Sequence, residues 1–254
     1  MGNSRLSLPI TSKHLEKYGT KTLKIGCASM HGSRATNEDD HCVKIDFSPK
    51  RHPNTTFVGV FDGHSGSRTS SFCRNEIHKA VSTLSDLSDS KELEGAVLAV
   101  DKKLLEETDR NPTNPNRDDA GSTLVFATIQ PIESGQDGQK KHSVTVSHCG
   151  DSRALIISSN GDIRALTTDH KPTLASEADR IYAADGAVVR GRIDDLLAVS
   201  RAVGDFQFKR NPTRGVTEQK VIAVPSCCSV QLLESDLVRF FFLGYSLFIV
   251  IAWM

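Results

Sequence analysis

Hydrophobic and polar positions in the first part of the chain follow patterns that predict β-strands. Residues 57–61 (FVGVF) form an uninterrupted apolar run, which is typical of a buried strand. Before it, residues 41–47 alternate apolar and polar side chains, and residues 21–30 form another strand-like segment. Residues 1–20 are polar and carry Pro9 and Gly19, so we expect a flexible N-terminal lead-in there.

After residue 66 the apolar period changes from that of a strand to that of a helix. Between residues 72 and 84, apolar side chains fall on one helical face. A second helix is predicted after Asp89, whose carboxylate can cap it, with Glu92 three residues later as in a capping box. This helix carries an apolar stripe suited to core packing, formed by Leu93, Val97, Val100 and Leu104.

The second half of the chain returns to strand patterns and contains one further helix, predicted for residues 174–184. The predicted strands are residues 122–129, 143–149, 153–158, 163–166, 196–199 and 221–224. Strands and helices therefore do not alternate along the chain. This order favours an α+β fold, in which antiparallel sheets have helices packed outside them, over a doubly wound parallel sheet.

Composition places the chain among ordinary globular proteins. Its 254 residues suit one large domain or two small ones, and its 31 basic and 31 acidic residues cancel. A zero net charge gives no general attraction to nucleic acid or anionic lipid, so we expect no nucleic-acid partner. The six cysteines lack metal-ligand spacing and no secretory signal opens the chain, so we expect a reduced, cytoplasmic protein.

Two features raise the alternative of peripheral membrane association. Gly2 follows the initial methionine, but Leu6 stands where the myristoylation pattern requires Ser or Thr. Residues 240–254 carry no charge, although a membrane-spanning helix needs about 20 apolar residues. We interpret this segment as a degenerate core strand with an apolar end, and membrane contact stays open as the alternative.

Acidic and polar residues gather where predicted strands end. Glu38 and Asp39 precede one strand, Asp62-Gly63-His64 follows the buried strand at 57–61, and Asp151 follows the strand at 143–149. Carboxylate and carbonyl oxygens suit Mg²⁺ or Mn²⁺ rather than zinc or copper. No EF-hand loop, nucleophile elbow or phosphate-binding Gly-Lys-Ser/Thr loop is present in the sequence.

Six segments in a fixed order resemble the motifs of the metal-dependent protein serine/threonine phosphatases, the type 2C family. They are RATNED (34–39), VFDGHSG (60–66), AGST (120–123), CGDSR (149–153), LTTDHKP (166–172) and LAVSRAVGD (197–205). The resemblance covers residues 21–244 and leaves residues 245–254 as a divergent apolar tail. It implies two packed antiparallel β-sheets flanked by pairs of helices, an α-β-β-α sandwich that is incomplete at the C-terminus.

The resemblance also implies a site and a reaction. Asp62 is expected to bridge two Mg²⁺ or Mn²⁺ ions, with the Gly63 carbonyl on one ion and a metal-bound water held by Glu38. Asp39 is expected to support that side of the site, or to sit at a strand end without touching metal. The implied activity is hydrolysis of phosphoserine and phosphothreonine in proteins by a metal-activated water.

Three further roles follow from the same resemblance. Arg34 is expected to bind the substrate phosphate, although it could also be a solvated loop cation. His64 is expected to protonate the departing Ser or Thr oxygen. Asp151 is expected to help hold a weaker third metal, or simply to close a turn. The implied partners are phosphoprotein substrates, and the implied state is a monomer.

The sequence departs from the family pattern at its C-terminal end. The family completes its metal site with two more aspartates, and by alignment Ser246 or a near neighbour stands where the first belongs. The second has no counterpart in this sequence. We therefore expect weaker metal binding and weaker catalysis, with a non-catalytic phosphoprotein-binding module as the alternative function.

Overall fold

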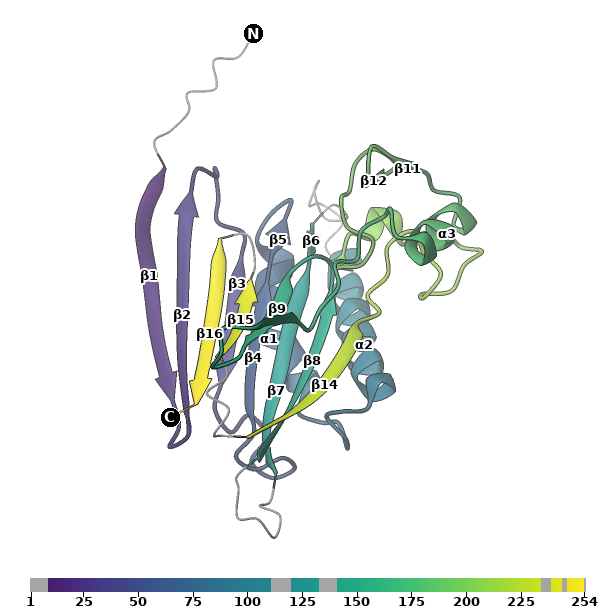
Figure 1. Cartoon of the computed structure of the whole chain (residues 1–254). Coiled ribbons are helices and arrows are strands. Elements are labelled where there is room, and N and C mark those ends of the chain that lie inside the picture. Colours follow the sequence, from purple (N-terminus) through teal and green to yellow (C-terminus); the bar gives the residue numbers. More distant parts are fainter. Residues whose placement is uncertain (1–8, 111–119, 133–140, 234–238, 244–245, 254) are drawn as a thin grey trace.

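The computed structural model describes residues 9–110, 120–132, 141–233, 239–243 and 246–253. Two large β-sheets pack face to face, and helices α1 and α2 lie beyond one of them (Figure 1). Every strand pair within the sheets is antiparallel, as the element order predicts. The fold is therefore the α+β class that the sequence indicates.

The first large sheet has five strands in the order β14-β8-β7-β4-β3. Its inner strand β4 is buried along its whole length, as expected for an apolar run without alternation. The strands are β3 (Asp40–Lys44), β4 (Thr56–Phe61), β7 (Leu124–Ile132), β8 (Lys141–Cys149) and β14 (Ser226–Leu233).

The second large sheet has six strands in the order β1-β2-β16-β15-β9-β10. This sheet brings together strands from the two ends of the described chain, because β16 pairs with β2 on one side and with β15 on the other. The strands are β1 (Ile10–Gly19), β2 (Leu23–Gly32), β9 (Arg153–Ile157), β10 (Ile163–Ala165), β15 (Arg239–Leu243) and β16 (Leu247–Trp253).

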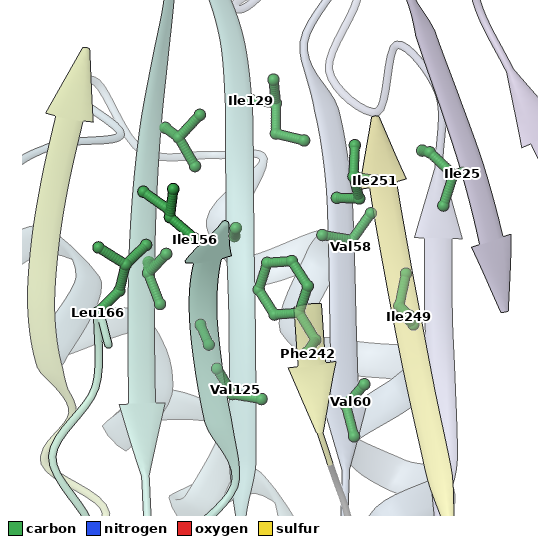
Figure 2. Close-up of a cluster of buried hydrophobic side chains, with 14 of the residues drawn as sticks. Ile25, Val58, Val60, Val125, Ile129, Ile156, Leu166, Phe242, Ile249 and Ile251 are labelled. Atoms are coloured by element: carbon green, nitrogen blue, oxygen red, sulfur yellow. The ribbon is translucent and has the colours of Figure 1, made fainter. Parts of the chain in front are cut away.

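The two large sheets enclose the main hydrophobic core (Figure 2). Ile25, Phe242 and Ile249 project into it from the six-stranded sheet, and Val58 and Val125 project from the five-stranded sheet. All five side chains are at most 2 % exposed. Removing this apolar surface from water is the main favourable contribution to holding the sheets face to face.

Helices α1 (Arg68–Val81) and α2 (Ser90–Asp109) cover the outer face of the five-stranded sheet. The Asp89 carboxylate caps α2 by accepting from the Lys91 and Glu92 N–H groups. The Glu92 carboxylate bonds to Ser85 and Asp86 instead of completing a capping box. None of the helices in the described ranges combines the length and apolarity that a membrane crossing demands.

The remaining elements form a smaller unit beside the sheets. It contains α3 (Ala175–Ala183), the β11 (Val188–Val189) and β12 (Arg192–Ile193) pair, and a short 3₁₀ helix η1 (Phe206–Phe208). A three-stranded sheet in the order β13-β6-β5 joins this region to the main body. Its strands are β5 (Gly63–His64), β6 (Gly121–Ser122) and β13 (Val203–Gly204).

The helix pair expected on the second sheet is not found among the described elements. Helices α1 and α2 contact the five-stranded side, and α3 packs near β11. The outer face of the six-stranded sheet therefore carries no helix within the described ranges. Phe248 of β16 is 45 % exposed and Ile163 of β10 is 66 % exposed.

Both chain ends differ from the sequence-based expectation where they are described. Residues 10–19 form strand β1 rather than a flexible lead-in, while residues 1–8 lie outside the described ranges. This strand is exposed on both faces, so it needs no apolar alternation and its pairing with β2 rests on backbone hydrogen bonds. Residues 247–253 are an inner strand of the second sheet, which corrects the divergent tail and agrees with the interpretation of the uncharged segment as a core strand.

Two predicted strands are also wrong. Residues 196–199 and 221–224 form only isolated bridges, from Leu197 to Ile193 and from Ile222 to Arg201. Val199 and Val221 are nevertheless buried, in a small apolar cluster of the α3 region. Short apolar runs mark burial, and burial alone does not distinguish a strand from an irregular core segment.

Candidate active site

An open pocket of about 540 Å³ lies where the two large sheets meet the α3 region. Every residue that the sequence assigns to the site lines this pocket: Arg34, Glu38, Asp39, Asp62, Gly63, His64 and Asp151. These residues come from three separate segments of the sequence, at 34–39, 62–64 and 151. The pocket therefore gathers the predicted constellation in one place, while the role of each residue stays a prediction.

Strand β4 delivers Asp62 to the pocket, and strand β6 fixes its backbone. The Asp62 carbonyl accepts from the Thr123 N–H at 3.0 Å and from the Ser122 hydroxyl at 3.3 Å. A Cβ added to Gly63 would meet the Glu38 carbonyl oxygen at 2.4 Å. Only glycine permits this approach of two backbone segments, which brings the Glu38 loop against the end of β4.

Asp39 and Asp62 form a close pair of carboxyl groups. Their side chains are hydrogen-bonded to one another, and the Ser246 N–H donates to Asp39 Oδ2 at 2.6 Å. Burial raises the pKa of Asp39, and its hydrogen bonds and the nearby Arg34 charge oppose that rise only in part. Because two adjacent carboxylates repel each other, a cation that neutralises both would be favoured at this site.

His64 is paired with a carboxylate from a distant part of the chain. Its Nε2 lies 2.8 Å from Asp205 Oδ1 and 3.0 Å from Oδ2, and Asp205 is 1 % exposed. Burial lowers the pKa of His64, but the hydrogen bond and charge of Asp205, together with Asp62 and Glu38, raise it further than burial lowers it. Because a carboxylate only accepts, the pairing places a proton on Nε2.

Gly121 of the three-stranded sheet leaves space for the His64–Asp205 pair. Gly121 of β6 stands opposite His64 on one side and opposite Gly204 on the other. A Cβ added to Gly121 would lie 2.2 Å from Asp205 Oδ2, so a side chain there would displace the carboxylate. Asp205 itself has a left-handed backbone with φ of 53°, a conformation that aspartate tolerates better than most residues.

The remaining acidic residues of the pocket have local partners. The ammonium of Lys171 forms an ion pair with Asp151, so this carboxylate is already partly neutralised. Glu38 accepts from the Thr36 hydroxyl at 3.0 Å. Asp151 therefore contributes to the wall of the pocket as part of a Lys–Asp pair, which weakens the expectation that it holds a third metal.

The donor set has the chemistry of a hard-cation site. Carboxylate oxygens of Glu38, Asp39 and Asp62 and the Gly63 carbonyl suit Mg²⁺ or Mn²⁺. A divalent cation would offset the charge of the adjacent Asp39 and Asp62 carboxyl groups. Among the residues that the structure describes, however, no three acidic, histidine or cysteine side chains converge closely enough to hold an ion. The residues thus fit the cation in type, with a smaller ligand set than the family uses.

Sequence reasoning missed several residues of the site. It gave Asp205 no role in the site, and 141 positions separate His64 from Asp205. It also did not place Arg192 or residues 196–199, which line the pocket from the α3 side. The aspartate at the end of the LAVSRAVGD motif was the available signal, but a motif alone does not show which distant residue it contacts.

Comparison with known proteins places this site in a family. The family model for protein phosphatase 2C matches residues 23–242. The chain belongs to the protein phosphatase 2C family. A protein phosphatase 2C homolog 2 of Saccharomyces cerevisiae is 33% identical over 226 residues, which cover 87% of this chain and 45% of that protein.

Other phosphatases are also similar to this chain. Protein phosphatase 1B of Mus musculus is 32% identical over 243 residues, covering 91% of this chain and 59% of the relative. The chain thus spans about half the length of the curated relatives it matches. A phosphatase crystal structure from Toxoplasma gondii has a TM-score of 0.75 at 28% identity, covering 91% of this chain and 77% of that one.

Proposed function

We propose that this chain hydrolyses phosphoserine and phosphothreonine in proteins, with Mg²⁺ or Mn²⁺ as its cofactor. The observation that carries the proposal is the single pocket in which the family's phosphate-binding, acidic and histidine motifs meet. Membership of the protein phosphatase 2C family supports the reaction class. The substrates are accordingly phosphoproteins, which an open surface pocket can admit.

Each side chain has a task that its position supports. Arg34 lines the pocket and offers a planar guanidinium that suits a phosphoryl group. His64 lines the same pocket and has a raised pKa, which favours the protonated form that can donate to the departing serine or threonine oxygen. Asp205 holds the ring of His64 through Nε2 and stabilises its positive charge.

Asp62, the Gly63 carbonyl, Glu38 and Asp39 are the groups that would hold the cofactor. When bound, Mg²⁺ or Mn²⁺ supplies an activated water and offsets charge on the phosphoryl oxygens. The Ser246 N–H, which directly precedes β16, orients the Asp39 carboxylate. The negative charge of these acidic residues also repels a substrate phosphate until a cation neutralises it, so turnover depends on metal.

Phosphate release from a small aryl phosphate tests the proposal. We expect turnover in Mn²⁺, none above background with chelator, and a loss of at least about a hundredfold in Asp62→Asn, equivalent to roughly 3 kcal/mol of transition-state stabilisation. Asp179→Asn, which changes an exposed carboxylate on α3, is the matched control and should keep full activity. A folded wild-type chain that releases no phosphate with Mn²⁺ would overturn the proposal.

A second candidate is a non-catalytic module that binds phosphoproteins through Arg34. It is favoured by Ser246, whose backbone lies at the pocket where the family pattern has an aspartate, and by the small described ligand set. A pure binder would show affinity for phosphopeptides with no release of phosphate. The same assay therefore separates the two candidates.

We also propose a monomer in a reducing, cytoplasmic compartment. All six cysteines have free thiols, and four of them are buried. Burial raises the pKa of Cys27 and Cys42 to about 12 and about 11, which keeps these thiols protonated and unreactive. Size-exclusion chromatography with light scattering tests the monomer, since a mass twice that of the chain would contradict it.

A further inference from the structure

A second pocket of about 430 Å³ adjoins the candidate active site. We call it the flanking pocket; it lies where β1, β2 and β16 meet the Arg34 loop. Arg34 and Ser246 line both pockets. Met30 is tied to the shared border, because its N–H donates to the Ser246 carbonyl at 3.0 Å.

The charge of the flanking pocket is opposite to that of the active-site pocket. Lys13 and Arg34 line it together with His31, and none of its described lining residues is acidic. The acidic residue of the same strand, Glu16, lies on the other face of β1 and binds His14 and His41 at 2.8 and 3.1 Å. Lys13 forms no ion pair with Glu16, so Glu16 does not offset the positive charge that Lys13 contributes to the flanking pocket.

The walls between these cations are apolar and partly exposed. Lys13 stands opposite Met30, and Phe248 stands opposite Ala28, so these side chains share one face of the sheet. Met30 is 38 % exposed and Phe248 is 45 % exposed. The ring of His31 borders the same pocket, and its buried Nε2 has no hydrogen-bond partner among the described residues. An apolar wall with a few polar groups is typical of a ligand pocket.

Arg34 lines both pockets, so a phosphorylated residue bound to it determines which part of a substrate can reach the flanking pocket. A phosphorylated residue held at Arg34 has its chain neighbours within a few residues' span, about 3.3 Å for each extended residue. The side chain of such a neighbour can lay its methylene groups on the apolar wall and present a terminal charge to Lys13. Only a negative charge suits this position.

We propose that the flanking pocket binds an anionic side chain next to the phosphorylated residue of the substrate. The anion is a carboxylate of Asp or Glu, or a second phosphoryl group, and both are recognised by the same cations. This inference rests on the proposed function, since it assigns the substrate class of the same site. It selects phosphoproteins with acidic or multiply phosphorylated segments.

Peptide binding tests the inference independently of turnover. Labelled peptides carry a phosphonate analogue of phosphoserine, which resists hydrolysis, flanked by neutral residues, by aspartate or by a second phosphonate. Fluorescence polarisation in Mg²⁺ gives the Kd of each. We expect the aspartate peptide to bind about threefold tighter than the neutral one, as for one exposed ion pair. The doubly charged phosphonate should bind about fivefold to tenfold tighter.

Variants of two lysines on the same strand locate the effect. Lys13→Glu should abolish both preferences, and the milder Lys13→Gln should reduce them. Lys17→Glu makes the same charge change four residues away on the same exposed strand, outside the pocket lining, and should keep both preferences. Circular dichroism confirms that each variant is folded.

Three results would overturn the inference. They are equal affinity for neutral and acidic peptides, no binding of any peptide, or equal loss of preference in Lys13→Glu and Lys17→Glu. Aryl phosphate turnover by the wild-type chain reports separately on the proposed function. A chain with turnover but no acidic preference refutes only the flanking pocket, and a chain with the preference but no turnover refutes only the catalytic proposal.

Discussion

Two groups of charged side chains, one around Glu177 and one around Asp62, show opposite balances of charge. Glu177 is 1 % exposed, and its carboxylate accepts from Arg201 at 2.6 Å, Arg180 at 2.8 Å and the Ser200 hydroxyl at 2.6 Å. The two guanidinium groups also donate to backbone carbonyls, such as those of Gln219 and Val224. Every charge in this cluster therefore has partners within the described fold.

The acidic pocket lacks this balance. Glu38, Asp39, Asp62 and Asp151 line it with two arginines, and Asp39 and Asp62 are hydrogen-bonded to each other. A carboxyl pair of this kind is destabilising at neutral pH unless a proton or a cation joins it. The comparison teaches that buried charge with complete partners supports the fold, whereas an incomplete acidic set marks a place where a ligand completes the structure.

The largest expected effect is on stability, at Glu177. Glu177→Gln leaves Arg180 and Arg201 without a countercharge, so we expect the free energy of unfolding to fall by about 3–5 kcal/mol. Urea denaturation at pH 7 measures it. Asp179→Asn on the same helix is exposed and should change stability by less than about 0.5 kcal/mol. A loss at Glu177 no larger than at this control would contradict the structural role.

The same loss should depend on pH. Burial alone would raise the pKa of Glu177, but hydrogen bonds from Arg201 and Ser200 and the Arg180 charge lower it from 4.5 to about 2. A carboxyl group whose pKa is lowered by folding contributes stability above its unfolded pKa and loses it as pH falls towards the folded value. The stability difference between wild type and Glu177→Gln should therefore be full above pH 4.5 and shrink towards pH 2.

A smaller effect is expected on catalysis at Asp205. Asp205→Asn removes the charge that holds His64 protonated, so hydrolysis of a phosphoserine peptide should slow by about tenfold or more, within the range of general acid catalysis. Hydrolysis of nitrophenyl phosphate should slow less, because nitrophenolate leaves without needing a proton. Equal losses on both substrates would indicate only a structural role for Asp205.

The smallest expected effect is on the stability of the Asp62→Asn variant. Its sign is opposite to that of Glu177→Gln, so it tests the contrast between the two charged groups most sharply. Asp62→Asn replaces one member of the Asp39–Asp62 pair with an amide that can donate to the remaining carboxylate. We expect the metal-free protein to gain up to about 1 kcal/mol of unfolding free energy in chelator. A loss comparable to that of Glu177→Gln would mean that Asp62 supports the fold and would remove the distinction between the two groups.

Much of the fold follows from sequence patterns alone, and the exceptions have physical causes. The apolar run of β4 and the helical stripe of α2 are strong signals, because burial on both faces of a strand or on one face of a helix fixes the side-chain pattern. Strand β1 gave no such signal, because both of its faces are exposed. The uncharged segment at 247–253 gave an ambiguous signal, since an apolar run suits an inner strand, a tail or a membrane contact.

The sequence alone predicted only those residues of the candidate site that belong to a recognised motif. Arg34, Asp62 and His64 belong to motifs, and the structure brings them into one pocket. The His64–Asp205 and Asp151–Lys171 pairs depend on contacts between distant segments, which no local pattern encodes. Sequence supplied the chemical groups, and the three-dimensional arrangement decided which of them are neutralised.

Mn²⁺ binding tests the difference between the two charged groups most directly. Isothermal titration calorimetry on the wild-type chain should show saturable Mn²⁺ binding that is absent in Asp62→Asn and unchanged in Asp179→Asn. That result would mean that the acidic pocket is completed by a cation. A folded wild-type chain that binds no Mn²⁺, or an Asp62→Asn variant that binds it equally well, would contradict this conclusion.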